Sequence, residues 1–480
     1  MKIAVRDSEG FVLNLHTRMP FRYGIATMTR VPHFILQLTV EIDGRNYDGF
    51  AADNLAPKWF TKNPETSYPE ELAEIFDVTT HAREAAIELG SAGSPFELWT
   101  RLYEAQKSWA AGQYPPLLWN FGVTLVERAL IDAFCRSQGA TFAQVLRDNR
   151  LGTQLGYIFP ELSGIEPAQL LPKDPLRSIA VRHTVGLTDP LTDTEITEAE
   201  QTHDGLPASL DSYLQRNGID HLKIKLSGDV ERDLDRLSRL STLVETCGIS
   251  CAFTLDGNEN FHEVEPFVHL WERLHADSTI ANFMSGLIFV EQPFHRSVAL
   301  TPETCAALRA WKDRPPIIID ESDAEIGTLQ VALEGGYAGT SHKNCKGIFK
   351  GIANACLIAK RRQANPDAAL HMSAEDLTNV GPLALLQDLA VLASLGIPHA
   401  ERNGHHYFSG LSQFPECVQE EILTKHSDLY DLHPDGYPVL RVENGGVEIG
   451  SVIDAPFGFA GKINGDAFTS ERDWDVSVFA

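Results

Sequence analysis

Residues 251–256 read CAFTLD, residues 286–291 read GLIFVE, and residues 316–320 read PIIID. Each stretch is a short apolar run of residues that favour strands, and each ends in a carboxylate. Stretches with helical periodicity separate the runs, which is the pattern of βα units. In a barrel of such units the carboxyl ends of the strands meet on one face, so the three acidic ends are expected to converge.

Five more short runs, each followed by a stretch with helical periodicity, complete a set of eight, the number that closes a barrel. They cover residues 178–185, 221–226, 339–343, 369–373 and 396–401. Amphipathic stretches between the runs, such as residues 229–245, would form the outer helices. A doubly wound sheet is an alternative, but no glycine-rich phosphate-binding turn follows the first run. The sequence therefore predicts an α/β fold built on a (β/α) barrel.

The first third of the chain has a different pattern. Residues 34–40 read as a strand, and the turn Asp43-Gly44 leads into a second extended stretch, which predicts a hairpin. Apolar residues recur at helical spacing over residues 69–146. After residue 415 the βα rhythm stops, and we expect the tail to pack back on the first part. The predicted regions are a capping α+β region at 1–150, a catalytic barrel at 151–415 and a returning tail at 416–480.

The composition is that of a soluble globular protein with small-molecule partners. The chain has 480 residues, is 43% hydrophobic and carries a formal net charge of -26, so nucleic acid and anionic membranes would be repelled. Its seven cysteines form no CxxC pair, which disfavours a disulfide framework or a zinc knuckle and fits a reducing cytoplasm. The charged N-terminus lacks the apolar core of a signal peptide, and no apolar run is long enough to cross a bilayer.

Two lysines stand out in the second strand run. Lys223 and Lys225 are two residues apart, so their side chains point to the same face. Burying two amines together lowers the pKa of at least one, which would make a lysine usable as a base. A solvated edge strand with outward lysines is the alternative. Lys343 ends another run and is expected to stand across the barrel from Lys225, whereas Lys346 and Lys350 fall where the next helix should begin.

The three acidic strand ends, Asp256, Glu291 and Asp320, are the predicted metal ligands. Three carboxylates around one point would repel each other without a cation, and hard oxygen ligands suit Mg²⁺, with Mn²⁺ as an alternative. A single Asp after a strand is commonly the N-cap of the next helix, but three in register disfavour that interpretation. Glu321 follows Asp320 directly and is assigned as an outer or alternative ligand, and Asn258 as a hydrogen-bonding brace.

These motifs, in this order, resemble the muconate-lactonizing and mandelate racemase-like subgroup of the enolase superfamily. The motifs are Lys223-Ile-Lys225, Asp256-Gly-Asn258, Glu291-Gln-Pro293, Asp320-Glu-Ser322 and Ser341-His-Lys343. Residues 20–24 (PFRYG) resemble the loop that covers the substrate in that family, and residues 126–132 (VERALID) resemble the last helix of its capping domain. The resemblance spans most of the chain.

The resemblance implies a modified (β/α)₇β barrel with an α+β capping domain built from both termini. It implies Mg²⁺ bound by the three acidic strand ends and a substrate carboxylate bound to the metal. Lys225 and Lys343 would act as acid and base, with Lys223 beside them. We therefore expect abstraction of the α-proton of a small carboxylate, leading to racemisation or epimerisation.

Alternatives stay open for the reaction and the substrate. One alternative is a lyase on the same scaffold, either a dehydratase or a cycloisomerase. A second is a non-catalytic metal-binding homologue. A zinc hydrolase would need a His-x-His motif, which the first run lacks. The Asp-x-Asp that holds the substrate ammonium in related dipeptide epimerases is missing from residues 399–402. Candidate substrate contacts are Arg22, Tyr23, Glu375 and Glu401. Insertions are expected near residues 151–176 and 188–211, the latter mobile, and assembly into a homo-oligomer is left open.

Overall fold

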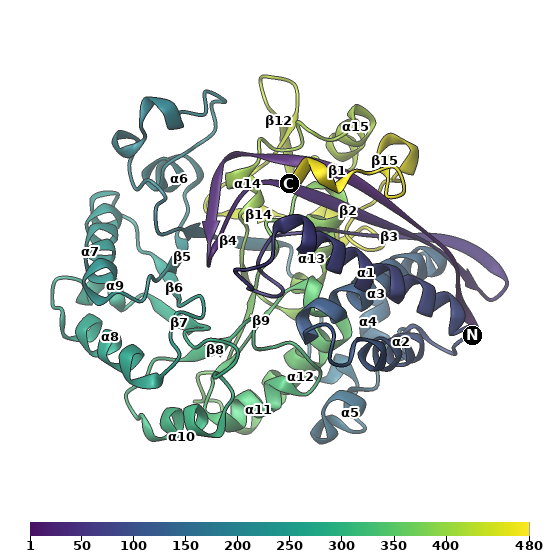
Figure 1. The fold of residues 1–480 in the computed structure, drawn as a ribbon, viewed down its shortest axis with the longest axis horizontal. Helices are drawn as coiled ribbons and strands as arrows, with labels where there is room; N and C mark the ends of the chain where they lie inside the picture. Colours follow the sequence, from purple (N-terminus) through teal and green to yellow (C-terminus); the bar gives the residue numbers. More distant parts are fainter. Residues whose placement is uncertain (480) are drawn as a thin grey trace.

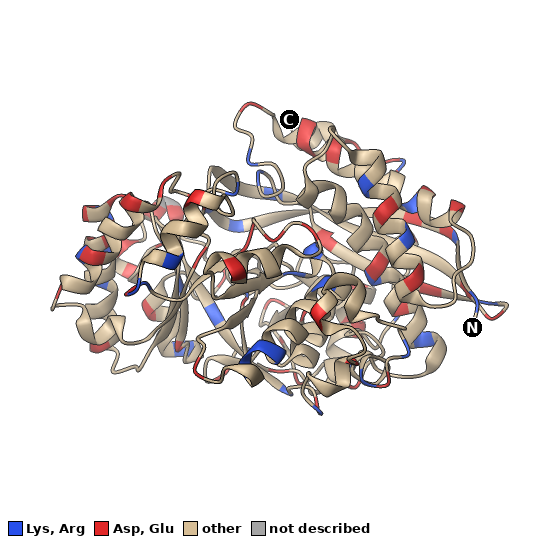
Figure 2. Ribbon diagram, turned by 90° about the horizontal axis from the view of Figure 1, so that it is seen from below, with Lys and Arg blue, Asp and Glu red and all other residues tan. Residues whose placement is uncertain are grey.

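The structure, a computed structural model, describes residues 1–479. An antiparallel sheet with its helices lies beside a curled parallel sheet that carries helices on its outer side (Figure 1). Acidic residues are spread over the outer helices (Figure 2), in keeping with the strong negative net charge. Among the described residues, no helix has the length and apolar character needed to span a membrane.

The antiparallel sheet forms the capping side of the molecule. Its strand order is β15 (Thr469–Ser470), β1 (Ile3–Tyr23), β2 (Ala26–Ile42) and β3 (Arg45–Asn54). Strands β2 and β3 are joined by the two-residue turn Asp43-Gly44, in which both residues have positive φ. Such turns match the twist of a hairpin, so the predicted hairpin is confirmed.

Four helices follow the sheet, where the sequence predicts helical structure. They are α1 (Tyr68–Glu88), α2 (Pro95–Ala110), α3 (Pro116–Gln138) and α4 (Phe142–Arg147). Helix α3 is buried over most of its length and packs on β2 and β3. Within α3, Glu127 accepts hydrogen bonds from the backbone N–H groups of Ile348 (3.0 Å) and Phe349 (2.7 Å). The segment VERALID therefore fastens the cap to the barrel at the start of α12 (Ile348–Ala364).

The packing of β3 on α3 depends on Gly49. A Cβ atom at this position would lie 2.0 Å from the carbonyl oxygen of Ala129 and 2.6 Å from the backbone nitrogen of Ala133. Since both contacts are backbone, we expect Gly49→Ala to lower the free energy of unfolding by at least about 2 kcal/mol. Urea unfolding measures this. Asn46→Ala, at an exposed site on the same strand, should change the free energy of unfolding by no more than about 0.5 kcal/mol from the unmodified protein. Equal stabilities of the two variants would show that Gly49 is not needed for this packing.

Eight parallel strands form the barrel within the described residues. They are β4 (Ser178–Val185), β5 (His221–Lys225), β6 (Ala252–Asp256), β7 (Leu287–Glu291), β8 (Ile317–Ile319), β9 (Gly339–His342), β10 (His371–Ala374) and β11 (His399–Glu401). Hydrogen-bonded neighbours follow chain order from β4 to β10, and β11 pairs with β4. Strands β10 and β11 contact each other, which closes the ring. All eight predicted strand runs are confirmed.

Helices cover the outside of the ring. They include α6 (Leu210–Asn217), α7 (Val230–Thr246), α8 (Val264–Ala276), α10 (Pro302–Ala310), α11 (Thr328–Gly335), α12 and α13 (Leu386–Leu395). In α7 the buried residues Leu237, Leu240 and Val244 lie on one face, as the amphipathic pattern predicts. The insertion between β4 and α6 carries two short 3₁₀ helices, Asp193–Glu195 and Glu198–Glu200.

The tail contacts both regions of the molecule. After α15 (Glu416–Lys425) come β12 (Tyr430–Leu432), β13 (Pro438–Leu440) and β14 (Gly446–Glu448). Strand β14 pairs antiparallel with the start of β4, and β15 pairs with β1. The tail thus returns to the cap through β15, while β14 joins the barrel sheet. The domain boundaries predicted at residues 150 and 415 stay predictions.

His426, at the end of α15, makes the tail sensitive to acid. Its Nε2 accepts the N–H of Ala460 (3.2 Å) and its Nδ1 bonds to Ser451 Oγ (2.8 Å). Burial lowers the pKa of His426 from 6.5 to about 4. Between these values the unfolded chain binds more protons, so the stabilisation is complete above pH 6.5 and is lost as the pH falls toward 4.

We therefore expect His426→Gln to flatten the decline of stability between neutral and acidic pH, by an amount on the order of 2 kcal/mol. Urea unfolding at a series of pH values measures it, with the exposed His275→Gln as the matched control. An unchanged slope in His426→Gln would show that other groups carry the acid response.

Candidate active site

One pocket of about 60 Å³ lies at the carboxyl ends of the barrel strands. Charged side chains from β5, β6 and β11 and from the residues that follow β8, β9 and β10 line it. They include Lys223, Lys225, Asp256, Asp320, Lys343, Glu375 and Glu401. Phe21, Tyr23 and Gly24, at the tip of the β1–β2 hairpin, and the segment 56–62 close it from the cap side. The predicted convergence of the strand ends is present.

Lys223 stands at the centre of the acidic groups. Its Nζ lies within 3.0 Å of four carboxylates, those of Asp256 (3.0 Å), Glu291 (2.9 Å), Glu375 (2.8 Å) and Glu401 (2.8 Å). Burial by itself lowers the pKa of Lys223, but the carboxylates outweigh it and hold the pKa well above its usual value. The pKa lowering expected for at least one lysine of the pair is therefore not seen at Lys223, because its nearest charges are acids rather than the second lysine.

Lys225 is held at one side of the pocket. Its Nζ bonds to Asp256 Oδ2 (2.6 Å) and to Asn258 Oδ1 (3.1 Å). The backbone N–H of Asn258 also donates to Asp256 Oδ1 (2.8 Å). Asn258 thus touches both partners, as expected of a bracing residue. Although burial raises the pKa of Asp256, Lys223 and Lys225 outweigh it and lower the pKa to about 2.

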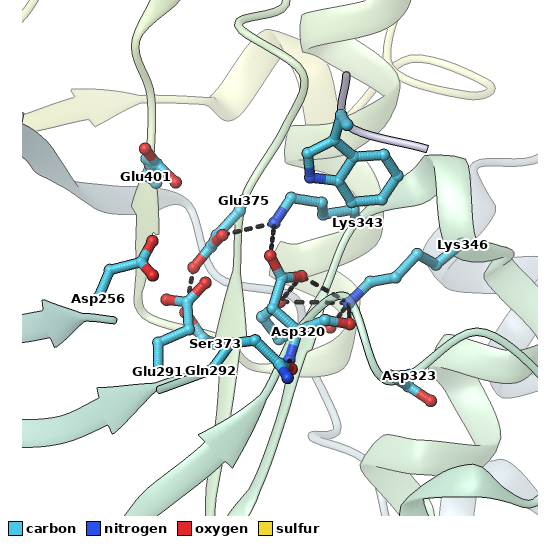
Figure 3. A network of polar contacts seen from close by, with 12 residues as sticks. Asp256, Glu291, Gln292, Asp320, Asp323, Lys343, Lys346, Ser373, Glu375 and Glu401 are labelled. Carbon is cyan, nitrogen blue, oxygen red and sulfur yellow. Dashed lines mark hydrogen bonds and ion pairs between the residues drawn. The ribbon is translucent and has the colours of Figure 1, made fainter. Parts of the chain in front are cut away.

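Lys343 is held in a different part of the same pocket. Its Nζ bonds to Asp320 Oδ2 (2.7 Å) and to Glu375 Oε2 (2.6 Å), as Figure 3 shows. The ring centroid of Trp59 lies 5.5 Å from this Nζ. Burial alone would lower the pKa of Lys343, but Asp320 and Glu375 raise it well above its usual value. Lys343 is therefore an ammonium group in this state.

Two cationic groups complete the network and were not expected from the sequence. Lys346 donates to Asp320 Oδ1 (2.9 Å) and to the carbonyl of Ser341 (2.5 Å), on the side of Asp320 away from Lys343 (Figure 3). Arg182 is fully buried on β4 and donates to Glu375 Oε1 (3.0 Å). An arginine within the apolar run 178–185 was the available signal, since such residues are rarely buried unless paired.

Glu291, Asp320 and Glu375 form the group best placed to hold a metal ion. One carboxylate oxygen from each lies within 4.8 Å of the others. Glu291 is fully buried, and its Oε2 has no hydrogen-bond partner. Burial, then Glu375, raises the pKa of Glu291 well above its usual value. Converging carboxylates with a free oxygen are what a hard divalent cation requires, so these residues fit one.

This group differs from the predicted ligand set in one member. Glu375, expected to contact substrate, belongs to this group instead of the predicted Asp256. Asp256 Oδ2 is instead engaged by Lys223 and Lys225. Glu291 and Asp320 belong to both sets, and the assignment of Asp256 to the metal stays a prediction.

The other predicted residues fall inside and outside the pocket. Glu321 lines it, its Oε2 has no partner, and burial followed by Asp320 raises its pKa to about 8. Tyr23 also lines the pocket, and its hydroxyl donates a hydrogen bond to the carbonyl oxygen of Pro57 (2.8 Å). Arg22 is not part of the lining and bonds to Thr188 Oγ1 (2.9 Å).

The comparisons with known proteins bear on the fold. No family model matches the chain, and no curated protein matches it. Among solved structures, a dipeptide epimerase from Enterococcus faecalis complexed with Mg and L-Leu-L-Tyr has a TM-score of 0.56 at 14% identity, covering 85% of this chain and 92% of that one. A muconate lactonizing enzyme from Pseudomonas fluorescens complexed with muconolactone has a TM-score of 0.57 at 16% identity, covering 93% and 94%.

A third similar structure, an N-succinyl Arg/Lys racemase from Bacillus cereus, has a TM-score of 0.56 at 16% identity and covers 94% of this chain and 97% of that one. These likenesses run over nearly the whole length of both chains. They confirm the predicted fold, a TIM-type barrel with an α+β cap as in the muconate-lactonizing and mandelate racemase-like enzymes.

Proposed function

We propose that this protein is a metal-dependent enzyme that abstracts the proton next to the carboxylate of a small substrate and returns it, which racemises or epimerises that carbon. One observation carries the proposal. Lys225 ends β5 and Lys343 follows β9, four positions further around a ring of eight strands, and both line one pocket. Amines on opposite walls can reach the two faces of one carbon.

The reaction needs stabilisation of charge, because proton removal places a second negative charge on the carboxylate. Mg²⁺, held by Glu291 and Asp320 with Glu375 or Asp256, would supply a Lewis acid for that charge. Lys223 adds a fixed ammonium that its four carboxylates keep protonated. Positioned cations of this kind cost no reorganisation during the reaction.

The two outer lysines move the proton at the substrate α-carbon. Lys343 is held as an ammonium group and is ready to donate, while Lys225 accepts on the other face. In the reverse direction the roles exchange, as interconversion of two enantiomers requires. Acid and base groups placed in this way contribute about 10²- to 10⁴-fold to the rate.

The small free volume of the pocket favours a compact substrate. The tip of the β1–β2 hairpin and Trp59 cover the lysines, and the free volume is about 60 Å³. Covering residues exclude water, which strengthens the electrostatic interactions inside. A small carboxylate fits this enclosure.

Exchange of the α-hydrogen in D₂O tests the proposal. The protein would be incubated with Mg²⁺ and a panel of N-acyl amino acids, dipeptides and 2-hydroxy acids, and NMR would follow loss of the α-proton signal. We expect exchange with at least one class, abolished by EDTA and restored by Mg²⁺ or Mn²⁺. An α-keto acid from an acid sugar would instead indicate a lyase, and Mg²⁺ binding without any turnover would indicate a non-catalytic protein.

A further inference from the structure

One ion pair lines the active-site pocket and takes no direct part in the chemistry above. Glu259 follows β6 and Arg296 follows β7. Arg296 Nε donates to Glu259 Oε1 (2.8 Å) and Arg296 Nη2 donates to Oε2 (2.8 Å), the parallel bonds of a bidentate pair. The backbone N–H of Arg296 also donates to Oε1 (2.8 Å). Because the Glu259 side chain is only 1% exposed, its charge depends on these partners.

The same guanidinium group holds the cap segment 56–62. Arg296 Nη1 donates to the carbonyl oxygen of Phe60 (2.9 Å), and Nη2 donates to that of Trp59 (3.2 Å). The Trp59 ring in turn faces the Nζ of Lys343, 5.5 Å from the ring centroid. An aromatic face attracts an ammonium group, so the place of the ring affects the place of the amine. Arg296 therefore acts on Lys343 through Trp59.

Lys62, in the same cap segment, leads to the other lysine of the proposed reaction. Its Nζ lies 3.2 Å from Glu259 Oε2 and donates to the carbonyl oxygen of Asn258 (2.7 Å). The side chain of Asn258 accepts the bond from Lys225 Nζ (3.1 Å). A continuous chain of contacts thus runs from the buried carboxylate of Glu259, through Lys62 and Asn258, to Lys225.

The backbone at this point has a conformation that non-glycine residues seldom adopt. Asn258 has a φ of 46° and Glu259 a φ of 62°, so two successive residues are left-handed. Such a backbone is costly, and it persists where the surrounding contacts fix it. Lys62 holds the carbonyl of Asn258, and Arg296 holds the side chain of Glu259. Removal of either contact would let the turn relax and move the Asn258 side chain away from Lys225.

We propose that the Arg296–Glu259 pair positions both lysines that move the proton, Lys343 through Trp59 and Lys225 through Asn258. The inference rests on the proton transfer proposed above. Loss of Arg296 would displace both lysines, whereas loss of Lys62 would displace Lys225 alone. The two variants therefore differ in which substrate enantiomer they affect.

Exchange of the α-hydrogen of each enantiomer in D₂O tests the inference. The probe is the N-acyl amino acid, dipeptide or 2-hydroxy acid that the unmodified protein exchanges in the presence of Mg²⁺. Arg296→Met is expected to lower kcat on the order of 10- to 100-fold for both enantiomers, since small displacements of reacting groups are this costly. KM should change by less than about threefold, because acid and base positioning acts on the transition state.

Lys62→Met is expected to lower kcat by about 10-fold for the enantiomer that Lys225→Ala loses, and much less for the other. Arg296→Lys keeps the charge but not the planar fork, so it should recover part of the rate that Arg296→Met loses. The matched control is Arg273→Met, which breaks the exposed ion pair with Glu231 and should exchange like the unmodified protein.

Backbone hydrogen–deuterium exchange, followed by mass spectrometry on the protein with Mg²⁺ alone, provides a readout without turnover. Arg296→Met is expected to speed the exchange of amides in both segments, 58–62 and 257–260, because it removes the contacts that join them. Lys62→Met should speed exchange mainly in segment 257–260.

Equal kcat values in Arg296→Met and the unmodified protein would overturn the inference and leave the proposed function standing. A loss in Lys62→Met that is the same for both enantiomers would do so too. If the unmodified protein exchanges no probe, the proposed function fails and this inference fails with it. A purely structural pair would lower the thermal stability of Arg296→Met without lowering kcat, and Arg296→Lys decides the matter if Arg296→Met does not fold.

Discussion

We expect Lys225→Ala to abolish α-hydrogen exchange of one substrate enantiomer in D₂O, and Lys343→Ala to abolish that of the other. The lysines stand on opposite walls of the barrel, so under the proposed mechanism each would reach one face of the substrate carbon. The expected loss is about 10²- to 10⁴-fold in rate, the contribution of a positioned acid or base. NMR of the separate enantiomers in D₂O, with Mg²⁺ present, measures it.

Neither variant should unfold the barrel. Without Lys343, Asp320 still has its ion pair with Lys346, and Glu375 still has its ion pairs with Lys223 and Arg182. The exposed Lys312→Ala variant serves as the control and should exchange like the unmodified protein. If both lysine variants exchange both enantiomers normally, the assignment of acid and base is refuted.

Glu291→Gln is expected to weaken Mg²⁺ binding by at least about 100-fold, close to 3 kcal/mol. Glu291 is common to the predicted and the observed carboxylate groups, and its Oε2 has no other partner. Because the pKa of Glu291 is already well above its usual value, the neutral amide should cost little stability. Isothermal titration calorimetry with Mg²⁺ and the paramagnetic resonance spectrum of bound Mn²⁺ measure the loss of metal affinity independently of turnover.

The same titrations decide the third ligand. Greater loss in Glu375→Gln than in Asp256→Asn would assign Glu375 to the metal, and the reverse would support the ligand set predicted from the sequence. Glu303→Gln, at an exposed site on α10, is the matched control. Unaltered Mg²⁺ affinity in Glu291→Gln would place the metal site elsewhere.

The sequence predicted the barrel well because β6, β7 and β8 are short, largely buried apolar runs. The runs at residues 251–256 and 286–291 agree with β6 and β7 to within one residue. Convergence of Asp256, Glu291 and Asp320 then follows from topology alone, since parallel strands deliver their ends to one face.

The charge state of the lysines could not be predicted in the same way. It depends on how many carboxylates surround each Nζ, and those come from strands far apart in the chain. Four acids around Lys223 reverse the effect that Lys225 would have alone. Arg182 and Lys346 were missed for the same reason: their roles are defined by partners on other strands.

Strand β1 has one edge that is only partly paired. Strand β2 pairs with the other edge along most of its length, whereas β15 pairs with this edge only at Phe11 and Val12. The side chain of Gln413 satisfies both the N–H and the carbonyl of His16 (2.8 Å each). Together with the bridge between Ile3 and Ala92, these contacts cover part of this edge and limit its pairing with a neighbouring molecule. Removing residues 465–480 would uncover the backbone of Phe11 and Val12, and light scattering should then rise with protein concentration.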